Sequence, residues 1–247
     1  MIIRAKGIVI REQIISDYDR LVTVLTDTHG VIKAFVNGGR SIKNKNTAST
    51  GLLCYSDFSI NKTKKDVYRI QEATSIEAFF SLREDLLSLS LAQYFAEIIF
   101  ELAPREEKSD DFLRLILNSV YLIVNKKRDL KIIKAAFELR LLCLAGYMPN
   151  LIACQNCAAF ESEFMFFRPT FGDLFCKDCK PDGKSINIPI GVVTAMRHIC
   201  YCETKKLFNF ALSDEGLDKL NYITESYLKI ATNRRFKTLD FYKVMTD

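Results

Sequence analysis

The chain has 247 residues, of which 49% are hydrophobic and 26% charged, and its net charge is +5. This composition is typical of a folded globular protein and excludes an intrinsically disordered one. Its apolar runs are shorter than the roughly 20 residues of a membrane helix, so no membrane span is expected. The N-terminus also lacks the apolar core of a signal peptide. We therefore expect a cytoplasmic protein, in which cysteines stay reduced.

The first 80 residues carry a β pattern. Short runs rich in Val, Ile, Tyr and Phe alternate with polar turn sequences, as strands and their turns do. The predicted strands span residues 7–11, 21–26, 31–36, 53–60 and 67–73. Five short strands in this length indicate a small closed barrel, either of the oligonucleotide-binding (OB) type or SH3-like.

Basic residues concentrate in this β-rich part. Residues 33–69 contain eight basic and two acidic side chains, a net charge of +6 that exceeds the excess of the whole chain. Such a patch indicates a surface that binds a polyanion, with a merely solvated face as the alternative. The candidate phosphate-binding residues are Lys33, Arg40, Lys43, Lys45, Lys62, Lys64 and Lys65. The aromatic residues that either stack on bases or fill the barrel core are Tyr18, Phe35, Tyr55, Phe58 and Tyr68.

From residue 81 onward the apolar residues recur at helical spacing. The predicted helices cover residues 86–99, 110–124, 130–145, 189–202 and 213–232. Ser109 and Ser213 stand at positions typical of N-caps, and Gly146 can end the third helix in the left-handed conformation. The fold class is therefore α+β, with a barrel followed by a helical domain.

Four cysteines follow the pattern C-x2-C-x18-C-x2-C, formed by Cys154, Cys157, Cys176 and Cys179. Two such pairs place four thiolates around one point, as in a structural zinc site, and the residues between them suit a β-hairpin. Two redox pairs or four loose thiols are the alternatives, although the strand-to-helix context of a redox motif is absent. We expect one structural Zn²⁺.

The sequence offers little for catalysis. Four thiolates leave no open position for a water or substrate, unlike a catalytic zinc. No phosphate-binding loop or nucleophile elbow occurs, so we expect no enzyme, with a metal-dependent nuclease or deaminase as the alternative. Cys54 and Cys143 suit the core, whereas Cys200 and Cys202 beside His198 form a weak candidate for a second metal site.

The order of motifs resembles the RecO family of bacterial recombination mediator proteins over the whole chain. The resemblance rests on the run 18–26, on His29-Gly30 and Lys33, and on residues 37–41. It continues with residues 137–142, with Gly146-Tyr147 and Pro149, with the cysteine quartet, and more loosely with residues 235–238.

This resemblance implies an OB barrel over residues 1–80, a helical domain over 81–150, a zinc module over 151–182, and helices over 183–247 that complete the helical domain. It implies binding of single- and double-stranded DNA, annealing of complementary strands, and help in loading the recombinase onto DNA coated by single-strand-binding protein. The implied partners are DNA, RecR and the acidic C-terminal tail of the single-strand-binding protein, at the nucleoid.

The chain departs from the family where some relatives carry basic residues that help to hold the acidic tail. Ala135 and Ala136 occupy these places, so the tail site cannot be transferred, and Lys134, Arg140 and Arg235 are guesses at a substitute. A non-catalytic adaptor with a zinc module and no direct DNA contact is the alternative function.

Overall fold

The computed structural model describes residues 1–41, 43–64 and 66–246, which form two compact units. Unit 1 comprises Met1–Asn125 and Phe236–Asp247, and unit 2 comprises Lys126–Arg235. The α+β class is confirmed, because an N-terminal sheet precedes the helices. Within the described residues no helix is long and apolar enough to cross a membrane.

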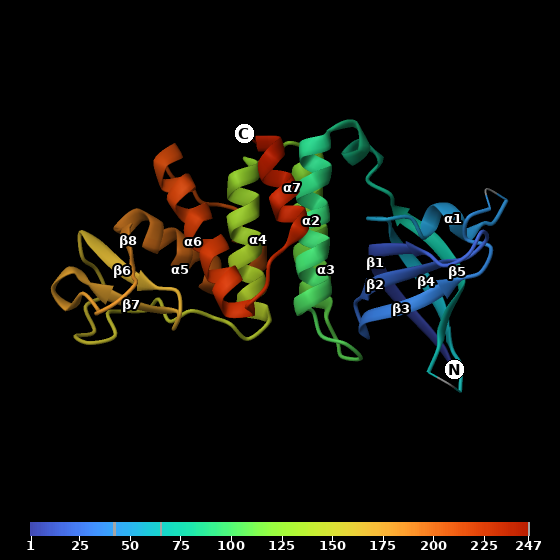
Figure 1. Ribbon diagram of the computed structural model, residues 1–247, viewed down its shortest axis with the longest axis horizontal. Coiled ribbons are helices and arrows are strands. Elements are labelled where there is room, and N and C mark those ends of the chain that lie inside the picture. The colour runs from blue at the N-terminus through green and yellow to red at the C-terminus, as the bar shows by residue number, and fades with distance from the viewer. Residues whose placement is uncertain (42, 65, 247) are drawn as a thin grey trace. The chain divides into compact units, whose positions relative to one another are not determined.

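A closed five-stranded barrel forms the N-terminal part of unit 1 (Figure 1). The strands follow the order β1-β2-β3-β5-β4, in which β3 and β5 are parallel and the other neighbouring pairs are antiparallel. Apolar side chains from all five strands fill the interior and form one cluster. The strands are β1 (Ile2–Ile14), β2 (Arg20–Thr26), β3 (Gly30–Val36), β4 (Tyr55–Lys62) and β5 (Tyr68–Glu77).

Strand β1 starts at Ile2, within the N-terminal segment 1–7 that is typical of the start of a strand, and continues beyond residue 11, where the predicted apolar run ends. It pairs with β4 through residues 2–8 and with β2 through residues 7–14, with a register shift between Val9 and Arg11. The part of β1 beyond residue 11 therefore depends on pairing with β2 rather than on its own composition. The short helix α1 (Asn46–Ser49) was not predicted, and β4 begins at Tyr55 because Leu53 adopts a positive φ of 62°.

Three helices and a 3-10 turn complete unit 1: η1 (Phe80–Glu84), α2 (Leu86–Leu102), α3 (Asp110–Val124) and α7 (Lys237–Thr246). Helix α2 is buried along most of its length and begins at Asp85, whose side chain accepts from the backbone N–H of Leu87. Ser109 stands at the predicted N-cap position of α3, but its hydroxyl donates to the carbonyl of Thr26 at 2.7 Å instead of capping the helix.

The barrel contacts the segment between α2 and α3 through a close approach of the backbone at Gly30. The Val31 N–H donates to the Pro104 carbonyl at 2.9 Å, and Gly30 has a φ of +62°. A Cβ at Gly30 would lie 2.1 Å from the Pro104 carbonyl oxygen, so a side chain has no room there. The His29-Gly30 turn therefore requires glycine for both its conformation and its packing.

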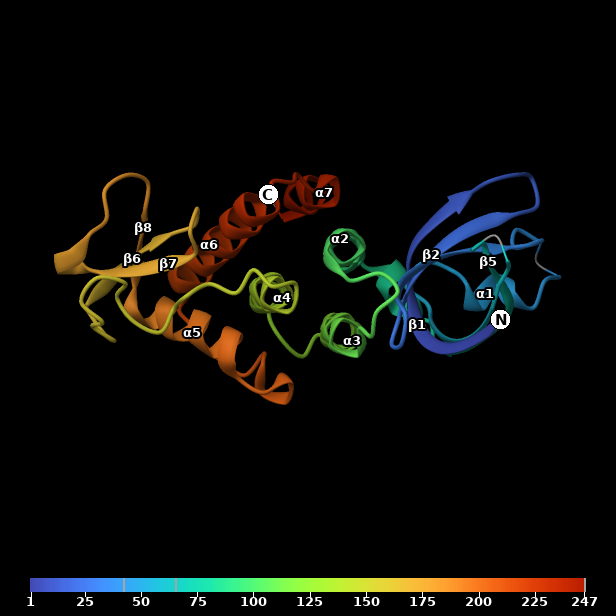
Figure 2. The same ribbon diagram turned by 90° about the horizontal axis from the view of Figure 1, so that it is seen from below.

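Helix α7 was not predicted, because its position depends on tertiary contacts with α2. The Thr238 N–H donates to Glu97 at 3.0 Å, and the ring of Phe236 meets that of Tyr94 edge-on with 6.1 Å between centres. This segment returns the chain to unit 1 after unit 2 is complete. Figure 2 shows α7 beside α2 in a second view.

Unit 2 combines three helices with a small antiparallel sheet of order β7-β6-β8. Ser213 accepts from the Gly216 N–H and so caps α6 as predicted, and Gly146 follows α4 with a φ of +88°, also as predicted. The strand β8 was not predicted. The elements are α4 (Leu130–Leu144), β6 (Phe164–Arg168), β7 (Asp173–Cys176), η2 (Lys177–Cys179), β8 (Ile186–Pro189), α5 (Ile190–Tyr201), η3 (Thr204–Lys206) and α6 (Asp214–Thr232).

Candidate metal centre and basic surface

The four cysteines of the spaced pattern converge in unit 2. Cys154 and Cys157 lie in the loop before β6, Cys176 ends β7, and Cys179 ends η2. The first loop is tied to the hairpin, because the Gln155 N–H donates to the Leu174 carbonyl at 2.8 Å. The hairpin thus brings Cys176 and Cys179 close to Cys154, although they follow it by 22 or more positions in the sequence.

The spacing of the sulfur atoms fits a metal ion. All four Sγ atoms lie within 4.8 Å of one another, and Cys157 and Cys176 Sγ are 3.6 Å apart. Four thiolates at about 2.3 Å from a zinc ion lie about 3.8 Å apart. The quartet can therefore hold a metal ion with four sulfur donors, which leaves no position open for a substrate.

The environment of the quartet favours the thiolate form at Cys154 but the neutral thiol at Cys157 and Cys179. Burial raises the pKa of the Cys154 thiol, but hydrogen bonds from the backbone N–H groups of Cys157 and Cys176 outweigh it and lower the pKa to about 6. Hydrogen bonds with the Cys157 and Cys176 sulfurs raise the pKa of Cys179 to about 12. Four converging thiolates repel one another, and a bound cation removes that repulsion.

Arg197 of α5 holds the first cysteine loop against the helices. Its guanidinium donates to the carbonyl oxygens of Leu151 at 2.7 Å, Ile152 at 3.0 Å and Phe160 at 2.6 Å. It also lies 4.0 Å from the centre of the Phe160 ring. One arginine thus binds the loop on both sides of Cys154 and Cys157, a role that the sequence pattern does not reveal.

Tyr227 of α6 fixes the other side of the module. Its hydroxyl donates to the Tyr147 carbonyl at 2.9 Å, and its ring meets Phe167 edge-on with 5.4 Å between centres. A Cβ at Gly172, whose φ is +67°, would lie 2.7 Å from the Tyr227 hydroxyl. The hairpin turn therefore packs directly on α6.

The remaining cysteines do not join the quartet. Within the described residues, the quartet is the group of His, Cys, Asp and Glu side chains that converges enough to hold a metal. The His198 Nε2 lies 2.9 Å from the Lys206 carbonyl, and the Cys202 sulfur accepts from Arg140 at 3.2 Å. The weak candidate formed by Cys200, Cys202 and His198 therefore receives no structural support.

Apart from Lys33 on β3, the predicted phosphate-binding residues that the structure describes fall into two groups on the barrel. Arg40, Lys43 and Lys45 lie in the loop that leads into α1, whereas Lys62 and Lys64 lie at the β4–β5 turn. That turn is next to the N-terminus, where Met1 and Lys62 exchange backbone hydrogen bonds, and Figure 1 shows it far from α1. Lys65 lies outside the described residues.

Two of these lysines are neutralised locally. Lys45 pairs with Glu72 at 2.6 Å, and Lys62 pairs with Asp66 at 3.3 Å and Glu106 at 3.7 Å. Arg40, Lys43 and Lys64 are exposed and form no ion pair with any described residue. The net charge of residues 33–69 therefore overstates the number of free cations at any one place.

Arg40 shares its surface with an exposed aromatic ring. The Arg40 N–H donates to the Tyr18 carbonyl at 3.1 Å, and its guanidinium donates to the Ser16 carbonyl at 3.3 Å. Tyr18 is 73% exposed, whereas Phe58 is buried in the barrel core. Among the candidate stacking residues, Tyr18 is therefore the one that the fold presents openly to solvent beside a free cation.

Lys33 belongs to a further basic cluster that the sequence did not reveal. Its ammonium lies 5.6 Å from the centre of the Phe100 ring, and the guanidinium of Arg11 lies 5.2 Å from the same centre. Arg105 approaches the ring to 6.0 Å. Three cations from β1, β3 and the segment after α2 thus surround one aromatic side chain. Their positions in the sequence carry no common motif.

Two sequence families match the chain in succession. "Recombination protein O N terminal" matches residues 1–79, and "Recombination protein O C terminal" matches residues 83–240. Together these matches include the barrel, both groups of barrel cations and the cysteine quartet.

Similar proteins extend this match over almost the full length. The DNA repair protein RecO of Acetivibrio thermocellus is 31% identical over 244 residues, which cover 98% of this chain and 97% of that protein. The protein of the same name from Caldicellulosiruptor bescii is 32% identical over 242 residues, covering 98% of each chain. A third, from Caldicellulosiruptor saccharolyticus, is 29% identical over 241 residues, covering 98% of each.

Proposed function

Because the chain belongs to the recombination protein O family, it is a protein of DNA repair and recombination, and we propose that it binds single- and double-stranded DNA. In this proposal it anneals complementary strands and assists the loading of the recombinase onto DNA coated by single-strand-binding protein. The supporting observation is the closed barrel that carries Arg40 as a free cation beside the exposed Tyr18, with Lys43 in the same loop as Arg40 and likewise unpaired among the described residues.

We assign the barrel to the OB type. The strand order β1-β2-β3-β5-β4, with a parallel β3–β5 pair that closes the sheet, supports this assignment. OB barrels bind single strands along a cationic groove and stack bases on aromatic rings. Arg40 supplies a cation and Tyr18 supplies an aromatic ring on the same surface of the barrel. Residues 1–80 are then the DNA-binding part of the chain.

The proposed DNA contacts are electrostatic and independent of sequence. Lys33, Arg40, Lys43 and Lys64 carry them most directly, since none pairs with a carboxylate of the described residues. Lys45 and Lys62 contribute after their acidic partners are displaced. A cationic surface also lowers the repulsion between two phosphate backbones, which is the physical requirement for annealing.

We propose that Cys154, Cys157, Cys176 and Cys179 bind one structural Zn²⁺. The four converging sulfur atoms and the lowered pKa of Cys154 support this role. The ion would stabilise the zinc module of residues 151–182 on the helices of unit 2. A closed shell supplies no catalysis, and we propose that the protein is not an enzyme.

The proposed partners beyond DNA are RecR and the acidic tail of the single-strand-binding protein, in the cytoplasm at the nucleoid. Two substitutes considered for the tail site are engaged elsewhere. Lys134 is 4% exposed and pairs with Glu138 at 2.8 Å, and Arg140 donates to the Cys202 carbonyl at 2.6 Å. The tail contact is therefore not assigned to Lys134 or Arg140.

The decisive test is annealing of complementary strands coated with the cognate single-strand-binding protein. We expect the zinc-loaded chain to accelerate annealing, with a rate that falls as salt rises. A parallel gel-shift assay uses a naked single-stranded oligonucleotide. A chain that binds the single-strand-binding protein but neither shifts the oligonucleotide nor accelerates annealing would be an adaptor, and the proposal would be wrong.

A further inference from the structure

Unit 2 contains a hollow between the small sheet and α6 that lies outside the metal centre. We call it the hairpin hollow, and its volume is about 790 Å³. Strands β6 and β8 and the loop after Cys179 form one side, and the exposed face of α6 forms the other. The residues that matter below are Phe166, Lys180, Lys184, Asn187, Tyr222 and Ile230.

The charge of the hairpin hollow is positive. Lys180 and Lys184 line it, and no acidic residue does. Both lysines are exposed, and neither forms an ion pair with the residues that the structure describes. Asp178 and Asp182 belong to the same part of the chain but do not line the hollow. A surface of this kind attracts an anionic ligand.

Aromatic surface lies beside these cations. Tyr222 is 60% exposed on the rim, and Ile230 follows two turns later on the same face of α6 with 46% exposure. The Lys180 ammonium lies 5.1 Å from the centre of the Phe166 ring, which fixes the cation above an apolar floor. Asn187 adds a neutral hydrogen-bonding group.

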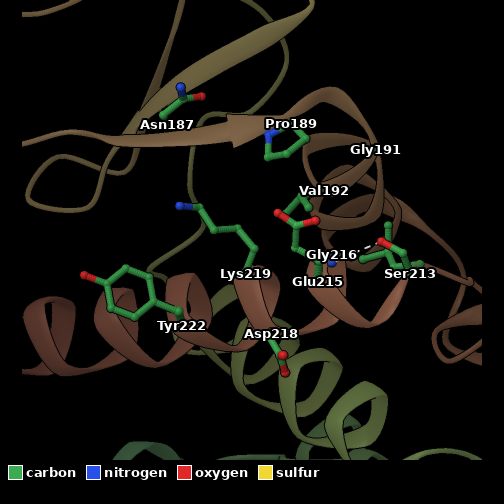
Figure 3. A pocket seen from close by; sticks show the side chains of 11 residues that line it. Asn187, Pro189, Gly191, Val192, Ser213, Glu215, Gly216, Asp218, Lys219 and Tyr222 are labelled. Carbon is green, nitrogen blue, oxygen red and sulfur yellow. Dashed lines mark hydrogen bonds between the residues drawn. The ribbon is translucent and has the colours of Figure 1, made fainter.

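A neighbouring pocket that contains acidic residues adjoins the hairpin hollow. This pocket, of about 770 Å³, shares Asn187 and Tyr222 with the hollow but is lined by Glu215 and Asp218 as well as Lys219. Figure 3 shows this second pocket, with the hydroxyl of Tyr222 pointing away from Ser213 and Glu215. Carboxylates repel phosphates, so an anionic chain in the hairpin hollow is not expected to continue past Tyr222 toward the start of α6.

We propose that the hairpin hollow binds a single nucleic-acid strand, with phosphates at Lys180 and Lys184 and one base stacked on Tyr222. Free cations beside an exposed aromatic ring match a ligand that alternates phosphates with flat apolar bases. The inference rests on the proposed function, to which it adds a second strand-binding surface in a different unit from the barrel. Annealing requires two strands, and two separate surfaces on one chain can hold one strand each.

The test uses the full zinc-loaded chain and a photoreactive oligodeoxythymidine, with the cross-linked peptides identified by mass spectrometry. We expect one cross-linked peptide to contain Tyr222, separate from any peptide of the barrel. The K180E/K184E variant should lose this cross-link and anneal complementary strands about fivefold or more slowly, because two phosphate contacts become repulsive. The K205E/K206E variant changes the same charge on exposed residues of η3 and should behave like wild type.

Two variants of Tyr222 distinguish the contribution of base stacking from that of the lysine charges. The Tyr222→Ala variant should lose the cross-link and slow annealing about fivefold, whereas Tyr222→Phe keeps the ring and should retain both. Absence of the Tyr222 peptide, or normal annealing by K180E/K184E, overturns the inference. A further measurement compares binding of an acidic peptide by the wild type and by K180E/K184E. If K180E/K184E loses binding to the peptide but binds the oligonucleotide as the wild type does, the hollow binds a protein and the inference is overturned.

The two proposals fail in distinguishable ways. If the wild-type chain binds no oligonucleotide at all, the proposed function is wrong and the inference falls with it. If the chain binds oligonucleotide and cross-links only through the barrel, the proposed function stands and the hairpin hollow is not a strand-binding surface.

Discussion

The guanidinium of Arg197 donates to the carbonyl of Phe160 at 2.6 Å and lies 4.0 Å from the centre of the Phe160 ring. Two further bonds to Leu151 and Ile152 place the start and the end of the first cysteine loop on a single side chain of α5. A bound zinc ion would fix the two pairs of cysteines to each other, and Arg197 fixes them to the helices. Arg197 therefore couples the first cysteine loop to α5, while Tyr227 holds the hairpin on α6.

Replacing Arg197 by Gln should loosen this loop. The variant loses charge-assisted bonds to three carbonyls, and we expect unit 2 to lose about 2–4 kcal/mol of stability. Thermal unfolding and the rate of zinc release to a coloured chelator measure the two effects. Lys205→Gln removes an exposed cation beyond the same helix and should change neither. An Arg197→Gln protein with wild-type zinc release would contradict the proposed coupling.

The buried charge pair of α4 gives a second prediction. Glu138 is fully buried, pairs with Lys134 at 2.8 Å and accepts from the Thr224 hydroxyl of α6 at 2.6 Å. The Glu138→Ala variant leaves the Lys134 charge with poorer compensation, and we expect a loss of about 3–5 kcal/mol in urea unfolding. The double variant K134M/E138L should recover much of this loss. If Glu138→Ala and K134M/E138L were equally stable, the uncompensated charge of Lys134 would not be the cause of the lost stability.

Short-range signals explain which features could be predicted from the sequence. The C-x2-C pairs bring their own sulfurs together, so Cys154 and Cys176 were recognisable without any knowledge of the fold. The capping by Ser213 and the left-handed Gly146 are equally local, and both were predicted correctly. Ser109 occupies the same kind of position, but its hydroxyl binds Thr26 in the barrel, which only the tertiary structure reveals.

Long-range contacts explain what could not be predicted. Helix α7 depends on Glu97 and Tyr94 of α2, more than 130 positions earlier in the chain. The net charge of residues 33–69 did not show that Lys45 pairs with Glu72 or that the candidate phosphate-binding residues lie at separate places on the barrel. Arg197 carried no signal at all, because a lone arginine in a helix most often points to solvent.

The ionisation of Tyr227 predicts how stability depends on pH. Burial raises the pKa of Tyr227 to about 12 from the 10.0 of an exposed tyrosine. Its neutral form therefore stabilises unit 2 fully below pH 10, and this contribution is lost as the pH rises from 10 through 12, by at most about 1.4 kcal/mol per pH unit. The slope should be visible as a falling melting temperature in alkaline buffer.

Two variants on the same helix separate this effect from other groups that titrate at alkaline pH. Tyr227→Phe removes the titrating hydroxyl and its bond to the Tyr147 carbonyl, so it should melt lower at neutral pH and decline less steeply above pH 10. Tyr222→Phe, at a 60% exposed position, should keep the wild-type profile. An unchanged alkaline slope in Tyr227→Phe would exclude Tyr227 as the source.

The basic loop before α1 gives the last prediction. Replacing Arg40, Lys43 and Lys45 by Ala should weaken binding of a single-stranded oligonucleotide and flatten its dependence on salt. Each lost phosphate contact changes the slope of log affinity against log salt by about 0.7, so the full change is at most about 2. Lys45→Ala alone should change the slope less than Lys43→Ala, because Lys45 already pairs with Glu72 and displacing that carboxylate offsets part of its gain.

Fluorescence anisotropy titrations over a range of salt concentrations measure these slopes, with K205A/K206A as the control for net charge. If the triple variant matched the wild type at every salt concentration, the phosphates would have to bind elsewhere on the chain, and the assignment of DNA binding to this loop would be wrong.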